Sequence, residues 1–352
     1  MYIPLIWMLP TLFESEEDLR KFLRSHLLLL IPVGLIGIVQ FFSPASSPIN
    51  AYAAEEASAV TFGSGVTAVR ITGTFSFISG YASYLMVCFG LLISLLAIHQ
   101  TWKWKIVTIA ELFLLIVNSF MTGSRAVIFT EVLFLAGYII ARGFRQPIST
   151  LNFIRRLLLP TLVIAIAAFI WFRPAIDAFW TRTTVNQDVS GRITDSFMQP
   201  LTYMQYKELD GYGTGATHQA APMLRQALNL PTGEVIPVGY ESEMGRIVLE
   251  LGPIGFLFWY GLRVSLALAL LVLFWKLKRP FLRQLALVAF LIQASQINSQ
   301  LVFHHTFSVY YWFLSSFIFL LPRLEEIENW HKEQQLLQEY VQSSYFPDSP
   351  YR

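Results

Sequence analysis

Four arginines stand near the ends of long apolar segments, where their chemistry could serve a ligand. They are Arg70, Arg125, Arg192 and Arg246. The guanidinium group is permanently charged, and its planar set of donors matches the oxygens of a phosphate group. The four residues therefore indicate a site for a phosphate-containing ligand. The alternative is that each side chain extends separately to the headgroups of a lipid bilayer.

Carboxylates accompany the last of these arginines. Glu241 and Glu243 precede Arg246, and Glu250 follows it shortly before the apolar run that begins at Pro253. A carboxylate that neighbouring arginines hold in the ionised state can accept a proton during a reaction. We interpret this stretch as a candidate catalytic segment. The alternative is a set of ion pairs at the start of a helix, with no catalytic role.

Three charged residues lie in the middle of apolar segments, namely Glu111, Glu131 and Arg263. A charge at the centre of a bilayer costs about 2.5–3.5 kcal/mol on insertion scales, and it usually finds a partner inside the bundle. We predict that Arg263 pairs with one of the two glutamates and that this pair is structural. A proton path is the alternative interpretation.

Other patterns carry weaker signals. The glycine-rich stretch Gly211–Gly215 resembles a phosphate-binding loop but follows no strand, so we interpret it as a flexible turn that could line the site. His304 and His305 lack further ligands at metal-binding spacing and are interpreted as surface residues. His218 has no local support as a base. The single cysteine, Cys88, excludes a disulfide framework, and we expect neither a metal nor another cofactor.

The composition indicates the elements that must position these residues. The chain has 352 residues, of which 55% are hydrophobic and 14% charged, whereas a soluble domain carries about 25% charged residues. This excludes a soluble enzyme, a disordered chain and a nucleic-acid-binding protein. Since a membrane helix needs about 20 mostly apolar residues, the apolar runs predict eight spans. They are Phe22–Phe42, Phe77–Ile98, Lys105–Met121, Arg125–Ala141, Arg156–Phe172, Pro253–Trp275, Phe281–Val302 and Phe307–Leu321.

Basic residues cluster in five places that all fall on one side of an eight-span bundle, and the positive-inside rule makes that side cytoplasmic. We therefore expect an all-α polytopic membrane domain over residues 1–322, with both termini in the cytoplasm and one large outer loop over 173–252. Residues 323–352 are expected to form a helical tail, either solvated or bound to a partner. The short apolar stretch Met1–Phe13 is interpreted as the remnant of a helix from a longer chain, or as a surface-lying segment.

The order of several short motifs resembles that of the O-antigen ligase and polymerase superfamily, whose members assemble bacterial surface polysaccharides. The matching motifs cover roughly residues 25–320, and their order and spacing carry the resemblance. They are Gly37-Ile38-Val39-Gln40-Phe41, Arg70-Ile71-Thr72-Gly73-Thr74-Phe75, Thr122-Gly123-Ser124-Arg125, Ser190-Gly191-Arg192, Gly211–Gly215, and Glu250-Leu251-Gly252 with Gly255.

The resemblance implies a helical bundle similar to the C-type glycosyltransferases, in the bacterial inner membrane. It implies a donor glycan linked to undecaprenyl pyrophosphate, and its transfer without metal to an acceptor glycan or glycolipid. The family arginines that hold the pyrophosphate correspond to Arg125 and Arg192, with Arg70 and Arg246 expected to help. Other polysaccharide export components are candidate partners.

One motif departs from the family pattern. Ligases of this family often carry a His-Asn pair nine residues before the Glu of the Glu-x-Gly motif, and this sequence has Glu241 and Ser242 there. The difference favours a polymerase-like branch, in which Glu241 would act as base and Glu243 as its substitute. The expected function is therefore that of a polysaccharide polymerase or ligase-like glycosyltransferase. The alternatives are a transporter or flippase for a lipid-linked or anionic solute, and a non-catalytic membrane component.

Overall fold

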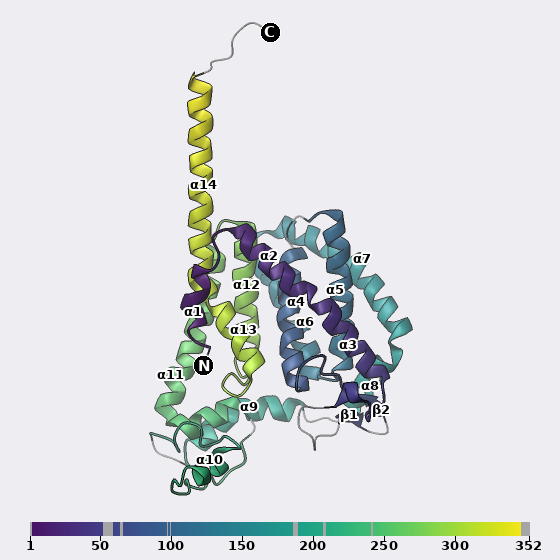
Figure 1. Cartoon of the computed structure of the whole chain (residues 1–352), viewed down its shortest axis with the longest axis vertical. Helices are drawn as coiled ribbons and strands as arrows, with labels where there is room; N and C mark the ends of the chain where they lie inside the picture. The colour runs from purple at the N-terminus through teal and green to yellow at the C-terminus, as the bar shows by residue number, and fades with distance from the viewer. Residues whose placement is uncertain are drawn as a thin grey trace.

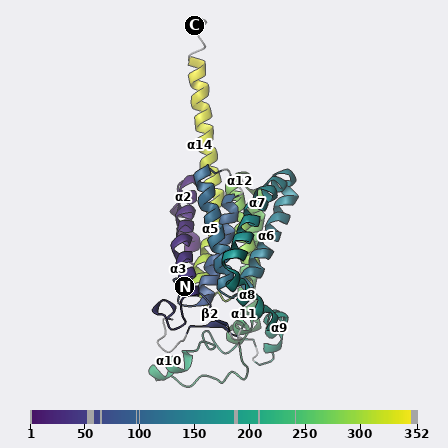
Figure 2. The same cartoon turned by 90° about the vertical axis from the view of Figure 1, so that its right-hand side faces the viewer.

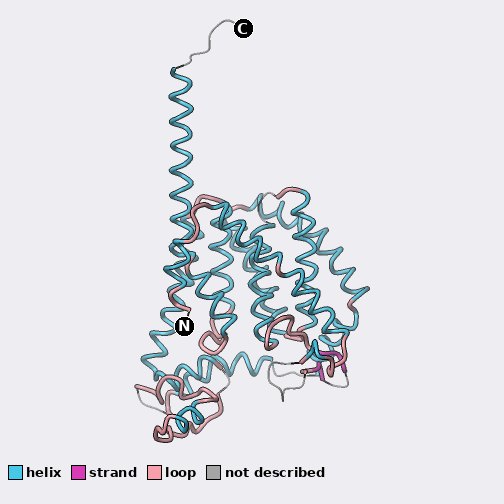
Figure 3. Tube along the Cα trace, in the orientation of Figure 1, coloured by secondary structure: helices cyan, strands magenta, loops and turns pink. Residues whose placement is uncertain are grey.

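The computed structural model describes residues 2–51, 59–63, 66–96, 98, 100–185, 189–206, 209–240 and 242–345. Helices make up most of this part of the chain, and its short strands lie together near one end of a helical bundle (Figure 3). The inward-facing apolar side chains of the long helices merge into a large continuous core.

The elements follow one another with short connections, except between α3 and α4 and around α10. In chain order they are α1 (Leu5–Met8), η1 (Leu9–Thr11), α2 (Glu16–Leu28), α3 (Leu30–Phe42), η2 (Pro48–Asn50), β1 (Thr61–Gly63), β2 (Val66–Val69), α4 (Ile78–Leu96), α5 (Trp102–Met121), α6 (Arg125–Arg145), α7 (Pro147–Trp171), α8 (Arg173–Val185), α9 (Val189–Tyr203), α10 (Ala221–Ala227), α11 (Glu243–Lys276), α12 (Pro280–Ser295), α13 (His305–Ser315) and α14 (Phe317–Tyr345).

Six helical segments within the described residues are long and apolar enough to cross a membrane. They are Glu16–Phe42, Ile78–Leu96, Trp102–Met121, Arg125–Arg145, Glu243–Lys276 and His305–Val341. Together they give the chain the build of a helical, multi-pass membrane protein. Each of the six overlaps one of the spans expected from the sequence. The expected span Arg156–Phe172 falls in α7, a helix of 25 residues.

The remaining expected span, Phe281–Val302, is shorter than predicted because its helix, α12, stops at Ser295. Sixteen residues reach only about 24 Å, which is less than the ~30 Å hydrocarbon core of a bilayer. The residues that follow are mostly polar, from Gln296 to Gln300, and they form a loop rather than a further turn of helix. This loop, residues 296–304, is called the α12–α13 loop below.

The two ends of the bundle differ in what they carry (Figures 1 and 2). One end, called the hairpin end, carries β1 and β2, helices α8 to α10 and the α12–α13 loop. The other, called the basic end, carries the connections α4–α5, α6–α7 and α11–α12, as well as the projecting part of α14. The expected outer loop 173–252 is therefore not plain loop, because α8, α9, α10 and the start of α11 lie within it.

The C-terminal tail does not begin as a separate unit at residue 323. Helix α14 runs from the buried Phe317 to Tyr345 without a break and extends far beyond the bundle (Figure 1). Its base is held at the basic end by Arg279, whose Nε lies 2.6 Å from Glu16 and whose Nη2 lies 3.4 Å from Glu328. These pairs fix the direction in which the tail leaves the bundle.

The first residues of the chain pack against the bundle with one side, while Trp7, Met8 and Leu12 stay exposed. Ile6 and Phe13 are buried, and Arg323 donates a hydrogen bond to the carbonyl of Pro10. Tyr2 meets His305 edge to face, with ring centroids 6.4 Å apart. Because His305 begins α13, the first residues of the chain lie beside the start of that helix.

Helix α11 bends sharply at Gly252, in its first third. Gly252 has φ 68° and ψ 179°, outside the helical region, and Pro253 follows it. A Cβ at Gly252 would lie 2.1 Å from the carbonyl oxygen of Leu209. Only glycine meets both demands, so the kink fixes how the segment Glu243–Leu251 leaves the axis of the helix.

We expect the substitution Gly252→Ala to destabilise the protein strongly. The left-handed backbone alone costs a side chain about 1–2 kcal/mol, and the contact with Leu209 adds to this cost. The matched control is Gly261→Ala in the same helix, where nothing lies within 4 Å of an added Cβ; it should be neutral or slightly stabilising. Thermal unfolding in detergent, followed by tryptophan fluorescence, measures both. Equal melting temperatures for the two variants would contradict the role given to the kink.

Candidate functional site at the hairpin end

The α12–α13 loop is held on one side by Arg263 of α11. This arginine is 1% exposed, and it donates to the carbonyl of Gln296 at 2.9 Å and to that of Ser299 at 3.3 Å. Its guanidinium group also lies over the rings of Tyr260 and Tyr311. The carbonyls at the end of a helix have no partner within that helix, and a cation there is favourable. Arg263 therefore caps α12.

Glu243, at the start of α11, holds the other part of the same loop. Its Oε1 accepts hydrogen bonds from the backbone amides of Leu301 at 3.1 Å and Val302 at 3.2 Å. Its Oε2 is buried and has no hydrogen-bond partner among the described residues. Arg263 and Glu243 thus clamp the α12–α13 loop from one helix, one through carbonyls and the other through amides.

The predicted pairing of Arg263 with Glu111 or Glu131 is wrong. Glu111 forms an ion pair with Arg24, with Oε2 and Nη1 3.1 Å apart. Glu131 accepts a 2.7 Å hydrogen bond from the hydroxyl of Ser119. The early end of α12 explains the difference, because it leaves backbone carbonyls beside Arg263 that satisfy its charge. All three intramembrane charges have structural contacts.

Arg246 stacks between aromatic side chains next to the clamp. Its guanidinium carbon lies 4.9 Å from the ring centre of Phe303 and 5.6 Å from that of Tyr240. The ring of His218, from the segment between α9 and α10, lies 5.3 Å from Phe303 on another side. The α12–α13 loop therefore meets the expected outer loop here.

The glycine-rich stretch is a built structure and not a flexible turn. Glu250 accepts from the amide of Gly215 at 3.0 Å and from the amide and hydroxyl of Thr217. Gly211, Gly213 and Gly215 all have positive φ, which lets the loop curl around the carboxylate. The donors that could bind a phosphate thus already bind Glu250, so this carboxylate is an anchor for the loop.

Arg70 and Arg125 meet at one turn. The turn between α5 and α6 consists of Thr122, Gly123 and Ser124, with Arg125 as the first residue of α6. Arg70 donates from Nε to the carbonyl of Thr122 at 2.9 Å. The expected placement of Arg125 at the tip of a helical hairpin is therefore correct, and Arg70 lies against the same tip.

A cavity of about 340 Å³ connects this turn to the α12–α13 loop. Its lining mixes polar and apolar side chains, and it is bounded by the start of α4, the start of α6 and the clamped loop. The polar residues that line it are Ser79, Ser83, Ser124, Gln296, Ser299, Gln300 and His304. The cavity thus lies beside Arg125, whose neighbours Ser124 and Ala126 line it, and the loop held by Arg263 and Glu243 forms its other wall.

His304 belongs to this cavity, although the sequence suggested a surface residue. Its Nδ1 accepts from the amide of Phe307 at 3.1 Å and so caps α13. The neutral ring then carries its proton on Nε2. Burial lowers the pKa of His304 below its ordinary value, against the opposing effect of its contact with the backbone of Ser79. This role was missed from the sequence alone, because the cap depends on the backbone amide of Phe307 and on where α13 begins.

The two remaining candidates are placed only in part. Glu241 lies outside the described residues. Arg192 lies in the described backbone of α9, and its side chain is outside the description. Their neighbours are fixed, because Ser242 caps α11 by accepting from the amide of Gly245 at 3.0 Å and donates to Gln199 of α9. Within the described ranges, no group of His, Cys, Asp and Glu side chains could hold a metal ion.

The chain matches no protein-family model, no curated protein and no solved structure.

We expect Glu250→Gln to loosen the segment between α9 and α11. The change removes the charge from hydrogen bonds that are worth about 1.5–3 kcal/mol each when one partner is ionised. Trypsin should then cleave at Arg225 several-fold faster than in the unchanged protein, as measured by limited proteolysis and mass spectrometry. Asp195→Asn on the exposed side of α9 is the control and should leave the cleavage rate unchanged. An unaltered rate in Glu250→Gln would show that the carboxylate is not the anchor.

Stability should fall as the pH is lowered through the range in which histidine titrates. Because the pKa of His304 is lowered in the folded state, the unfolded chain binds its proton at higher pH, so stability present above about pH 6.5 is lost below it. His304→Asn keeps a capping acceptor but does not titrate. Melting temperatures between neutral and mildly acidic pH should fall less in this variant, and His331→Asn on the tail should behave like the unchanged protein. Parallel curves for all three would refute the assignment.

Proposed function

We propose that this chain is a glycosyltransferase that moves a glycan from an undecaprenyl-pyrophosphate donor to an acceptor glycan or glycolipid. The proposal rests on the motif resemblance and on one structural observation. The turn that precedes Arg125 and accepts a hydrogen bond from Arg70 borders a cavity, and the other wall of that cavity is the loop clamped by Glu243 beside Arg246. Cations and a carboxylate segment from distant parts of the sequence thus meet at one end of the bundle.

In the proposed reaction, the arginines and the carboxylate segment have different roles. The arginines would bind the pyrophosphate and stabilise the negative charge that grows on it as the bond to the sugar breaks. A carboxylate would take the proton of the attacking acceptor hydroxyl. The new glycosidic bond then replaces the bond to the pyrophosphate, which leaves on its lipid. No metal is required by this scheme, because the arginines supply the positive charge.

The roles of the two carboxylates differ within the proposal. Glu243 already uses one oxygen to hold the α12–α13 loop, which suits a positioning role better than that of a second base. Glu241, directly before the cap of α11, remains the proposed base. The eight-span topology, with the hairpin end outside the bacterial inner membrane, is part of the same proposal.

The transporter or flippase hypothesis has less support. Its moving charges would be Glu111, Glu131 and Arg263, and each of them has a structural contact: the first with Arg24, the second with Ser119 and the third with backbone carbonyls. The projecting part of α14 would suit a non-catalytic component that binds partners. Removing residues beyond Glu328 separates this hypothesis from the enzyme, which should keep its activity.

The test is turnover by purified protein in nanodiscs with an undecaprenyl-pyrophosphate oligosaccharide, followed by release of undecaprenyl pyrophosphate. Arg125→Ala, Arg192→Ala and Glu241→Gln should each lower the rate by about 10²-fold or more, the usual effect of losing one stabilising donor or base. Arg173→Ala is the matched control, since Arg173 is an exposed arginine at the same end and pairs only with Asp177 among the described residues. Its rate should be unchanged. Equal rates in all variants, or no release by the unchanged protein, would overturn the proposal.

A further inference from the structure

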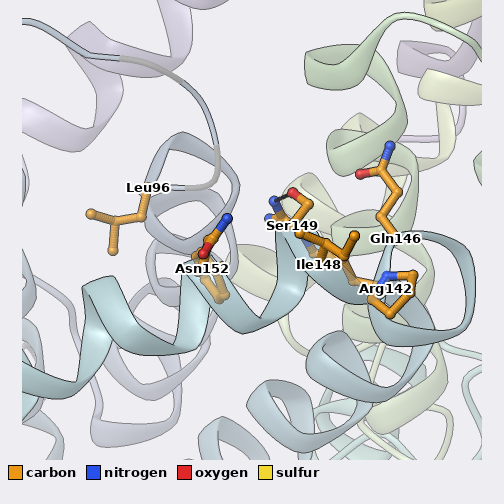
Figure 4. Close-up of a pocket in the computed structure, with 8 residues that line it drawn as sticks. Leu96, Arg142, Gln146, Ile148, Ser149 and Asn152 are labelled. Atoms are coloured by element: carbon orange, nitrogen blue, oxygen red, sulfur yellow. Dashed lines mark hydrogen bonds between the residues drawn. The ribbon is translucent and has the colours of Figure 1, made fainter.

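A second cavity lies at the basic end, far from the candidate site. It has a volume of about 500 Å³ and is bounded by the end of α4, the end of α6 and the start of α7. Its polar lining consists of Arg142, Gln146, Ser149 and Asn152. In Figure 4, Ser149 and Asn152 lie between Leu96 on one side and Gln146 on the other. Its volume is within the range of sites that hold small molecules or headgroups.

Arg142 forms the charged part of this cavity. It is 5% exposed, and it donates to the hydroxyl of Tyr138 at 3.2 Å and to that of Ser149 at 2.9 Å. Its Nε is buried and has no hydrogen-bond partner in the described part of the chain. Its guanidinium carbon lies 4.9 Å from the ring centre of Phe153. A buried cation with neutral partners and a free donor lacks the anion that would normally balance it.

Two further arginines increase this positive charge. Arg142 and Arg145 both act electrostatically on Arg283, which is also buried. In the described ranges, none of the three forms an ion pair with a carboxylate. Glu325 acts on Arg283 from a distance, but its Oε1 already accepts from the amides of Lys278 and Arg279, at 2.7 Å each. The cluster therefore carries an excess of positive charge next to a cavity with polar walls.

Exposed apolar side chains lie on α6 and α7 close in sequence to the lining residues, and Ile148 is itself part of the lining. Phe144 is 81% exposed, Ile148 76% and Leu151 56%. Within a bilayer, such residues face the acyl chains of lipids. The site thus has a cationic group in its lining and exposed apolar side chains nearby. These two features match the anionic headgroup and the acyl chains of a phospholipid. Basic pockets between helices on the cytoplasmic side of a membrane are known to hold anionic headgroups.

We propose that this cavity binds a phosphate group, and that its source is the headgroup of an anionic phospholipid. The phosphate oxygens accept from the guanidinium group of Arg142 and from Asn152, which both line the cavity, while the acyl chains lie along the exposed Ile148. Binding balances the charge shared by Arg142, Arg145 and Arg283, and it joins α6 to α7 at the basic end. This site is independent of the proposed glycan transfer, since it lies at the opposite end of the bundle.

Native mass spectrometry of the full chain released from detergent tests the site, with phosphatidylglycerol and phosphatidylcholine as probes. The unchanged protein should retain phosphatidylglycerol in preference to phosphatidylcholine. Arg142→Gln should weaken this binding by about ten- to a hundredfold, the effect of losing one charge-assisted hydrogen bond. Because Arg142 is buried and its loss could disturb folding, Asn152→Glu provides a second variant, which places a negative charge at an exposed position on the wall of the cavity. Lys103→Gln, an exposed cation at the same end, is the matched control and should bind as the unchanged protein does.

A parallel titration with inorganic phosphate distinguishes the two sources of this chemistry. If millimolar phosphate raises the melting temperature of the unchanged protein but not of Asn152→Glu, and phosphatidylglycerol does not bind selectively, the phosphate comes from solution. If phosphatidylglycerol binds selectively and phosphate has no effect, the lipid is the ligand. Equal retention of both lipids with no response to phosphate, or selective binding that neither variant weakens, overturns the proposal.

Discussion

Buried charge without a matching opposite charge is the constraint on which the hairpin end of this molecule depends. In a low-dielectric interior, an ionised group must be fully hydrogen-bonded or it destabilises the fold. Arg263, Glu243 and Glu250 bond mainly to backbone groups rather than to each other, and one oxygen of Glu243 stays without a hydrogen-bond partner among the described residues. Each orders a stretch of irregular chain, so three charged residues of one helix hold two connections in place. Two of them, Arg263 and Glu243, hold the loop that lines the cavity.

Some features of this structure could be predicted from the sequence, and others could not. The long apolar runs predicted the helices, because twenty consecutive apolar residues allow few other structures in a membrane. The tight turn before Arg125 was also predictable from its glycine. The end of α12 was not, because the polar residues from Gln296 to Gln300 are followed directly by Leu301 and Val302, and these apolar residues hid the boundary.

The candidate site was predictable in its parts but not in its contacts. Residue type alone marked Arg70, Arg125 and Arg246, and the structure brings the first two to one turn. The partner of Arg263 could not be predicted, since backbone carbonyls carry no signature in a sequence. His304 was missed for the same reason: its value lies in an amide that it caps. The spacing of residues in the sequence shows where charged side chains lie along the helices. Which backbone groups those side chains bind depends on where the helices end.

The continuity of α14 has a mechanical consequence. Between Glu328, where the ion pairs at its base end, and Tyr345, the helix extends about 25 Å without a hinge. A straight helix transmits bending and torsion along its length, so a load applied near Tyr345 acts as on a lever whose fulcrum is the contact with Arg279. The short arm of that lever is the buried first turn at Phe317, packed against the core. A partner bound to the tail therefore acts on the tilt of the bundle as well as on its position.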